Sequence, residues 1–138
     1  MKRVLPIVLV VVLVGVGLWF VQTRVKLRRD PFVMDFHNEA SNLIEGLQQY
    51  KEFVGSYPSG SAVEISRALS GQTDKKVLIL ATSKNKKNAK GEIVDPWGSP
   101  LQFYFAHNGV MIRSAGPNKV IEDSSVATSD DLYRTETK

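Results

Sequence analysis

The sequence predicts an α+β domain that follows an N-terminal membrane helix. Three observations lead to this prediction: an uncharged apolar run at 4–21, a helical stripe of apolar residues from 32 to 54, and an Asn-Gly pair at 108–109 between two strand-like segments. A long helix followed by an antiparallel hairpin is typical of a helix packed on a small sheet. We therefore divide the 138 residues into a membrane anchor with basic flanks, 1–30, and one small globular domain, 31–138.

The apolar run from Val4 to Val21 contains 18 residues without a charge. As a helix it would be about 27 Å long, close to the roughly 30 Å of a bilayer's hydrocarbon core. Trp19 suits the bilayer interface, and basic residues flank the run on both sides. A cleaved secretory signal is the alternative, but the run exceeds the usual h-region of about 7–15 residues and no A-x-A-like site follows. We expect an uncleaved single-pass anchor.

The basic excess of the chain belongs to this N-terminal segment. The formal charge is +4, yet residues 1–30 carry +5 and residues 31–138 carry −1. A nearly neutral domain does not have the basic surface of a nucleic-acid binder. The absence of cysteine excludes disulfides and thiolate metal or redox sites. Two bases before the run and four after it weakly favour a cytoplasmic C-terminal side by charge alone.

Two helices are predicted next. Pro31 is acceptable in a first helical turn, and apolar residues then recur at spacings of three and four over about 20 residues until Gly55. This stripe consists of Phe32, Phe36, Ala40, Leu43, Ile44, Leu47, Tyr50 and Val54. Ser61 and Glu64 form a capping-box pattern that predicts a second, shorter helix of about ten residues before Gly71.

The remainder predicts loops and one hairpin. The apolar segment 77–80 is either a buried strand or the end of a loop, and the lysine-rich segment 84–91 is an exposed loop. The segment 101–106 reads as a strand, Asn108-Gly109 as a type I′ turn, and 110–113 as the returning strand. Trp97, in a turn with two prolines, is expected to fill the core between helix and sheet. After Pro117 the chain is polar until Leu132 and Tyr133.

Catalytic chemistry has few candidates in this sequence. His37 and His107 lie 70 residues apart, and neither has the spacing of a metal-binding pair. We expect His37 on the polar face of the long helix and His107 beside the hairpin turn, each either exposed to solvent or in a capping role. There is no glycine-rich phosphate loop and no nucleophile elbow. The sequence does not predict an enzyme or a small-molecule substrate.

Oxygen-bearing residues gather near the C-terminus. The loop 114–118 and the segment 128–132 are rich in side-chain and carbonyl oxygens. Such oxygens suit Ca²⁺, a hard cation that takes six to eight oxygen ligands. The alternative is that Asp130 and Asp131 cap a last helical turn.

In chain order these residues resemble the pseudopilins of bacterial type II secretion, and the major pseudopilins in particular. The family pattern combines a membrane helix running into a long amphipathic helix with the motifs Y-P-[ST], D-P-W-G-x-P-[YL]-x-[YF], S-x-G-P-[DN] and D-D-[IL]. This chain matches them at Tyr57-Pro58-Ser59, from Asp95 to Phe103, at Ser114-Ala115-Gly116-Pro117-Asn118 and at Asp130-Asp131-Leu132. D-P-W-G-x-P is the most specific of the four.

The resemblance implies a pilin-like fold and a structural subunit of a type II secretion or type IV pilus-like filament. Like or related pseudopilin subunits would be its partners through the N-terminal helix. It implies a position in the bacterial inner membrane with the globular domain in the periplasm. The calcium ligands of the family would correspond to Asp130, Asp131, the Thr128 hydroxyl, Asn118 in place of an Asp, and the Ala115 carbonyl.

One departure from the family concerns processing. The prepilin peptidase signature, a Gly-Phe junction followed by a Glu five residues into the mature helix, is missing, and the run 4–21 contains no acidic residue. The alternative to a filament subunit is an anchored extracytoplasmic binding module that does not polymerise.

Overall fold

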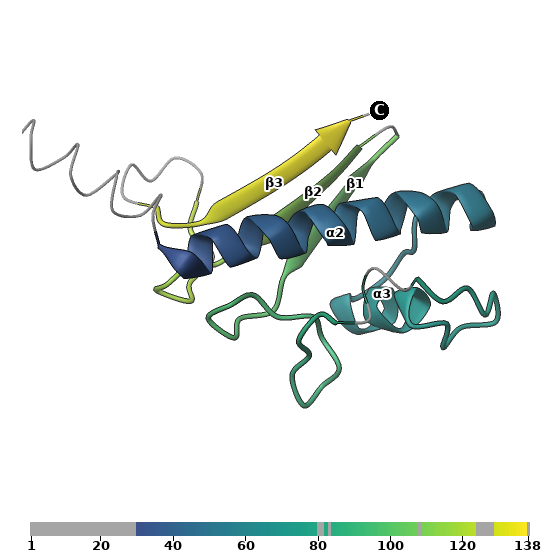
Figure 1. The fold of residues 1–138 in the computed structure, drawn as a ribbon, viewed down its shortest axis with the longest axis horizontal. Helices are drawn as coiled ribbons and strands as arrows, with labels where there is room; N and C mark the ends of the chain where they lie inside the picture. The colour runs from purple at the N-terminus through teal and green to yellow at the C-terminus, as the bar shows by residue number, and fades with distance from the viewer. Residues whose placement is uncertain (1–29, 80–81, 83, 108, 124–128, 138) are drawn as a thin grey trace, which may run out of the picture. The chain divides into compact units, whose positions relative to one another are not determined.

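The computed structural model describes residues 30–79, 82, 84–107, 109–123 and 129–137 (Figure 1). Its elements are α2 (Pro31–Val54), α3 (Ala62–Leu69), β1 (Gln102–Ala106), β2 (Gly109–Ser114) and β3 (Leu132–Thr137). The chain divides into the units 1–34 and 35–138, so the boundary lies inside α2. The anchor predicted at 1–30 falls almost entirely outside the described residues. In the part of the chain that is described, no helix has the length and apolar character needed to cross a bilayer.

The α+β class is confirmed: a long helix packs on a three-stranded antiparallel sheet (Figure 1). α2 ends at Val54 and Gly55 follows with φ +91°, a left-handed backbone conformation that ends helices and favours glycine. The predicted stripe is buried from Phe36 to Tyr50. At its start the prediction is wrong, since Phe32 is 49% exposed and Val33 is 7% exposed. Spacings of three and four both fit a helical stripe, and here the residue three before Phe36 is the buried one.

A glycine in α2 allows another segment to approach the helix closely. A Cβ atom at Gly46 would lie 2.6 Å from Cγ2 of Thr82 and 2.9 Å from Cγ2 of Ile79. Both of these residues are buried, and the Thr82 hydroxyl donates to the Ile79 carbonyl at 2.9 Å. The segment 77–80 forms no regular strand in its described residues, only an isolated bridge between Leu78 and Ser70.

α3 begins as its capping box predicts. The Ser61 hydroxyl accepts from the Glu64 amide at 3.4 Å, and the Ser61 amide donates to Oε2 of Glu64 at 2.7 Å. Hydrogen bonds to Ser61 lower the pKa of Glu64.

Replacing Ser61 with alanine is expected to lower the free energy of unfolding by about 1 kcal/mol, because the cap acceptor of α3 is lost. Urea unfolding followed by circular dichroism measures the change. Ser56→Ala, at an exposed position before the helix, is the matched control and should leave stability unchanged. Equal stabilities of the two variants would contradict a role for the cap.

The sheet has the order β1-β2-β3, with both neighbouring pairs antiparallel. The predicted hairpin is confirmed, but its turn is shifted by one residue. Ala106 pairs with Gly109, so the connection consists of 107 and 108 and Gly109 already belongs to β2. Two-residue connections match the twist of the strands that they join. β3 was not predicted, and a strand stands where the alternative interpretation of Asp130 and Asp131 placed a last helical turn.

Asp95 organises the turn before β1. It is 1% exposed, and its Oδ1 atom accepts from the amides of Trp97 at 3.0 Å and Ser99 at 2.8 Å. Its Oδ2 atom accepts from the Ser114 hydroxyl at 2.6 Å, which joins this turn to the end of β2. Trp97 packs half-buried against the core, as the sequence predicts.

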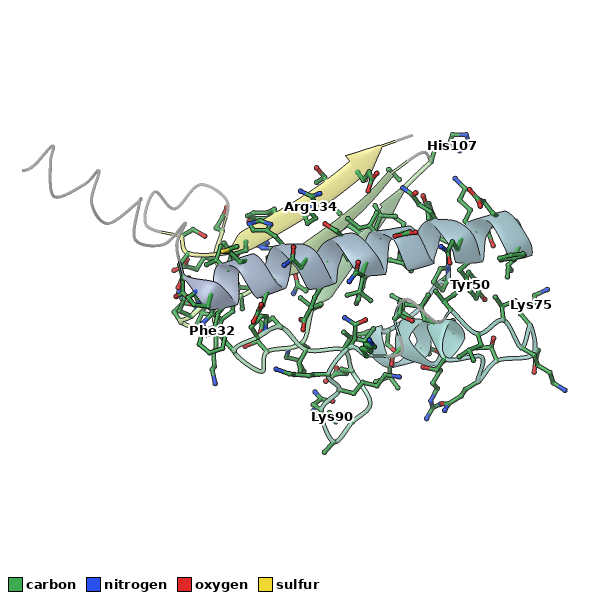
Figure 2. The ribbon with its side chains drawn as sticks, viewed as in Figure 1. Phe32, Tyr50, Lys75, Lys90, His107 and Arg134 are labelled. Atoms are coloured by element: carbon green, nitrogen blue, oxygen red, sulfur yellow. The ribbon has the colours of Figure 1, made fainter. Side chains whose placement is uncertain are left out.

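The two histidines differ in their surroundings. His107 is exposed, as predicted, but it lies in the hairpin turn itself rather than beside it (Figure 2). His37 is half-buried rather than solvated, with its ring 5.3 Å from that of Phe36 and its Nδ1 buried without a partner among the described residues. Burial lowers the pKa of His37, and repulsion from Arg134 lowers it further.

This lowered pKa predicts a pH-dependent stability. Because the unfolded chain binds a proton more readily at residue 37, stability is fully present above a pH of about 6.5 and falls as the pH drops through the lowered pKa. His37→Gln should remove this loss between pH 7 and 5, and His107→Gln should retain it. Thermal melts across that range measure the difference. Parallel pH curves for wild type and His37→Gln would refute the assignment.

Candidate metal centre

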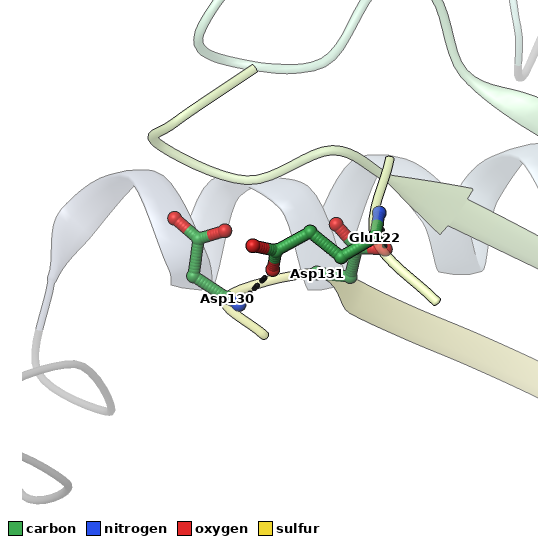
Figure 3. Close-up of side chains that lie close together, drawn as sticks. All are labelled: Glu122, Asp130 and Asp131. Carbon is green, nitrogen blue, oxygen red and sulfur yellow. Dashed lines mark hydrogen bonds between the residues drawn. The ribbon is translucent and has the colours of Figure 1, made fainter. Parts of the chain in front are cut away.

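Three acidic side chains meet where the loop after β2 approaches the start of β3. Glu122, Asp130 and Asp131 each offer a carboxylate oxygen, and these three oxygens lie within 4.8 Å of one another (Figure 3). Two ligands on opposite sides of a calcium ion are about 5 Å apart, so one ion can contact all three. Of these three residues, the sequence predicted only Asp130 and Asp131 as calcium ligands, and the structure adds Glu122.

Backbone amides hold the carboxylates in place. The Asp130 amide donates to Oε2 of Glu122 at 3.1 Å (Figure 3), and the Glu122 amide donates to Oδ2 of Asp131 at 3.2 Å. The Asn118 amide donates to Oδ2 of Asp130 at 3.1 Å. These bonds use one carboxylate oxygen of each aspartate, and no residue in the described part of the chain donates to the other oxygen.

The remaining aspartate oxygens are buried and have no partner among the described residues. These atoms are Oδ1 of Asp130 and Oδ1 of Asp131. The Asp131 side chain as a whole is 0% exposed. Leaving a buried acceptor unsatisfied costs about 1–3 kcal/mol, and more for a charged group. A bound cation would satisfy both atoms.

Arg113 is the basic residue at this cluster. Its guanidinium forms an ion pair with Oδ2 of Asp131, with Nε at 2.7 Å, and Nη2 also donates to the Glu122 carbonyl. Its Cζ atom lies 5.1 Å from the ring centre of Tyr133. Burial acts to lower the pKa of Arg113, but the hydrogen bonds to Asp131 and Tyr104 and the negative charge of Asp131 together outweigh burial, so the net shift of this pKa is upward. Arg113 therefore stays charged.

The charge balance of the cluster favours a divalent cation. Three carboxylates and one guanidinium leave a formal charge of −2, and within the described ranges neither Glu122 nor Asp130 forms a salt bridge. The atoms that could bind a metal ion here are all oxygens, which suit hard cations such as Ca²⁺ rather than zinc or copper. The residues present thus fit the calcium ion that the sequence suggests.

The other predicted ligands are Ala115, Asn118 and Thr128. Ala115 is buried in the loop beside the cluster. Asn118 reaches Asp130 through its backbone amide, while its side-chain Oδ1 accepts from the Val120 amide at 2.7 Å. Thr128 lies outside the described residues.

Gly116 allows this loop to lie against Asp130. Its φ is +66°, and a Cβ atom there would lie 2.4 Å from the Asp130 carbonyl oxygen. The Gly116 amide donates to the Ser114 hydroxyl at 3.0 Å, and that hydroxyl in turn donates to Asp95. The turn at 95–99, the loop at 114–118 and the acidic pair are therefore one connected unit.

Sequence reasoning missed Glu122 and Arg113. The sequence does contain an indication that Glu122 could be a ligand, because Glu122-Asp123 is the acidic pair nearest to the oxygen-rich loop 114–118. Arg113 carries no local signal, since an arginine in a strand is ordinarily solvated.

Calcium is expected to stabilise the domain. A ligand at ten times its Kd adds about 1.4 kcal/mol, which corresponds to about 5 °C in Tm for a domain of this size. We expect this rise in millimolar Ca²⁺ relative to chelator, and its loss in Glu122→Gln. Asp74→Asn, at an exposed site, is the matched control and should keep the rise. A wild-type Tm that is insensitive to Ca²⁺ would contradict the site.

Comparisons of the chain with family models, curated proteins and solved structures found no match.

Proposed function

We propose that this chain is a membrane-anchored, pseudopilin-like structural subunit of a type II secretion or type IV pilus-like filament. In this proposal residues 4–21 hold the chain in the bacterial inner membrane and pack against like subunits. The globular domain lies in the periplasm, and Ca²⁺ joins the loop after β2 to the start of β3. The chain has no catalytic role.

The observation that supports the proposal most is the connection among the motifs of the resemblance. Asp95 of the D-P-W-G-S-P segment accepts from Ser114 of the S-A-G-P-N segment. Asn118 of that second segment donates to Asp130 of the D-D-L segment. Motifs from three places in the chain thus meet through direct hydrogen bonds, as expected if they act together rather than match by coincidence.

A long helix packed on a small antiparallel sheet is also the arrangement that a pilin-like domain requires. In the proposal the amphipathic helix α2 continues the membrane helix. An apolar helix in lipid has its backbone groups satisfied internally, so side-chain packing selects its neighbours. A filament built through residues 4–21 needs no further binding site on the domain.

Disulfide cross-linking tests assembly, because the chain has no native cysteine. Full-length double variants would carry one cysteine within 5–10 and one within 15–20. Oxidation in membranes should give a ladder of trimers and larger species. The two single-cysteine variants are the matched controls and can give dimers at most. Double variants that yield only dimers or monomers would exclude the filament and favour an anchored binding module.

Topology is tested separately. Lys75 is exposed, so Lys75→Cys should react with a membrane-impermeant maleimide in cells whose outer membrane has been permeabilised (Figure 2). Labelling only after lysis of the inner membrane would place the domain in the cytoplasm, as the charges behind residue 21 favour.

A further inference from the structure

Among the described residues, β3 is an edge strand with an open side. It pairs with β2 alone, and among the described residues its backbone makes no hydrogen bond beyond that ladder. The strand lies at the margin of the sheet in Figure 1, and residues 133–136 are exposed. Its sequence, LYRTET, contains no proline or lysine, the residues that often protect natural edge strands from pairing with another chain. Its two charged residues, Arg134 and Glu136, have opposite signs.

The two charges of β3 are complementary to each other. Arg134 and Glu136 are two residues apart, so both project from the same face of the strand. Both are exposed, and within the described residues neither forms a salt bridge. When an identical strand lies alongside in the opposite direction, the arginine of each strand can lie opposite the glutamate of the other.

We propose that β3 is a contact between two copies of this chain, paired antiparallel about a twofold axis at Thr135. In this register Thr135 lies opposite Thr135 of the second copy. Arg134 of each copy then lies opposite Glu136 of the other, so the symmetry forms the charge pair twice. The two sheets become one continuous six-stranded sheet.

The charges select this register over its neighbours. A twofold axis at Arg134 would set the two arginines opposite each other, and an axis at Glu136 would do the same for the two glutamates. Like charges directly opposite are destabilising in a sheet. A shift of the axis by half a residue would join the inner face of one sheet to the outer face of the other, because side chains alternate along a strand.

This contact is small. The edge of a six-residue strand provides less area than the roughly 1,600 Å² of a standard interface, so the dimer is expected to be weak and concentration-dependent. The inference does not rest on the proposed function, since an anchored binding module would present the same edge.

A single cysteine at the twofold axis tests the pairing directly. The full chain in detergent, carrying Thr135→Cys, should form a disulfide-linked dimer on mild oxidation, because the two thiols face each other. Ala106→Cys, exposed at the end of β1 on the opposite edge, is the matched control and should cross-link much more slowly. Equal cross-linking rates for the two variants would overturn the proposal.

Charge reversal in the Thr135→Cys background tests the register. Glu136→Arg alone sets arginine against arginine and should slow cross-linking about tenfold, and Arg134→Glu alone should do the same. The double reversal restores both charge pairs and should recover the original rate. Circular dichroism confirms that each variant is folded. Slow cross-linking of a folded double reversal would exclude this register, as would single reversals without effect.

Discussion

Asp95→Ala should destabilise the domain by about 3–5 kcal/mol, the largest effect that we expect from a single polar substitution. The variant removes the acceptor of three hydrogen bonds at once, from the amides of Trp97 and Ser99 and from the Ser114 hydroxyl. Ser99 and Ser114 are buried, so water cannot replace the lost acceptor. Each unsatisfied buried donor then costs about 1–3 kcal/mol.

Chemical denaturation measures this loss as a shift of the unfolding midpoint. Asp95→Asn retains an oxygen for the two amides and should cost less than Asp95→Ala. Asp74→Ala, at an exposed position, is the control for removing a carboxyl group and should leave stability nearly unchanged. A loss below about 1 kcal/mol in Asp95→Ala would mean that the turn is held mainly by other contacts.

Gly116→Ala should destabilise the domain by about 2–4 kcal/mol and weaken its response to calcium. Two costs add. The backbone at φ +66° is strained for any residue with a Cβ atom, and that atom would lie 2.4 Å from the Asp130 carbonyl oxygen. The backbone of residue 130 cannot yield as a flexible side chain can, so the loop must move away from the acidic pair.

Gly98→Ala separates these two costs. Its φ is +90°, yet a Cβ atom at this position would have nothing within 4 Å. It should therefore show the backbone strain alone, about 1 kcal/mol, and keep the full rise in Tm with Ca²⁺. Thermal melts of both variants with Ca²⁺ and with chelator give the comparison. If Gly116→Ala and Gly98→Ala gave the same loss of Tm and the same rise of Tm with Ca²⁺, the close approach of Gly116 to Asp130 would contribute nothing to stability or to calcium binding.

Local patterns were sufficient for the helices and for the hairpin. The stripe of α2 from Phe36 to Tyr50, the cap at Ser61 and the pairing of two strand-like segments all depend on residues close in sequence. β3 escaped prediction because an exposed edge strand needs no regular apolar alternation. Its apolar residues, Leu132 and Tyr133, are adjacent and so point to opposite faces.

The acidic cluster was predicted in part. Asp130 and Asp131 were identified because they are adjacent and follow an oxygen-rich loop. Glu122 and Arg113 join them from eight and 18 residues away. The position of Arg113 follows from its pairing with Tyr133 across β2 and β3. This pairing joins residues that are distant in sequence, so no local sequence pattern predicts it.

The sequence by itself determined the apolar run, the α+β class, the two helices and the hairpin, because these follow from periodicity, capping and turn chemistry within short segments. Only the tertiary structure decided which oxygens face one another at the acidic cluster, that Arg113 neutralises Asp131, and that β3 forms an open edge. These depend on contacts between distant segments, and the free energy of such contacts becomes available only after the chain has folded.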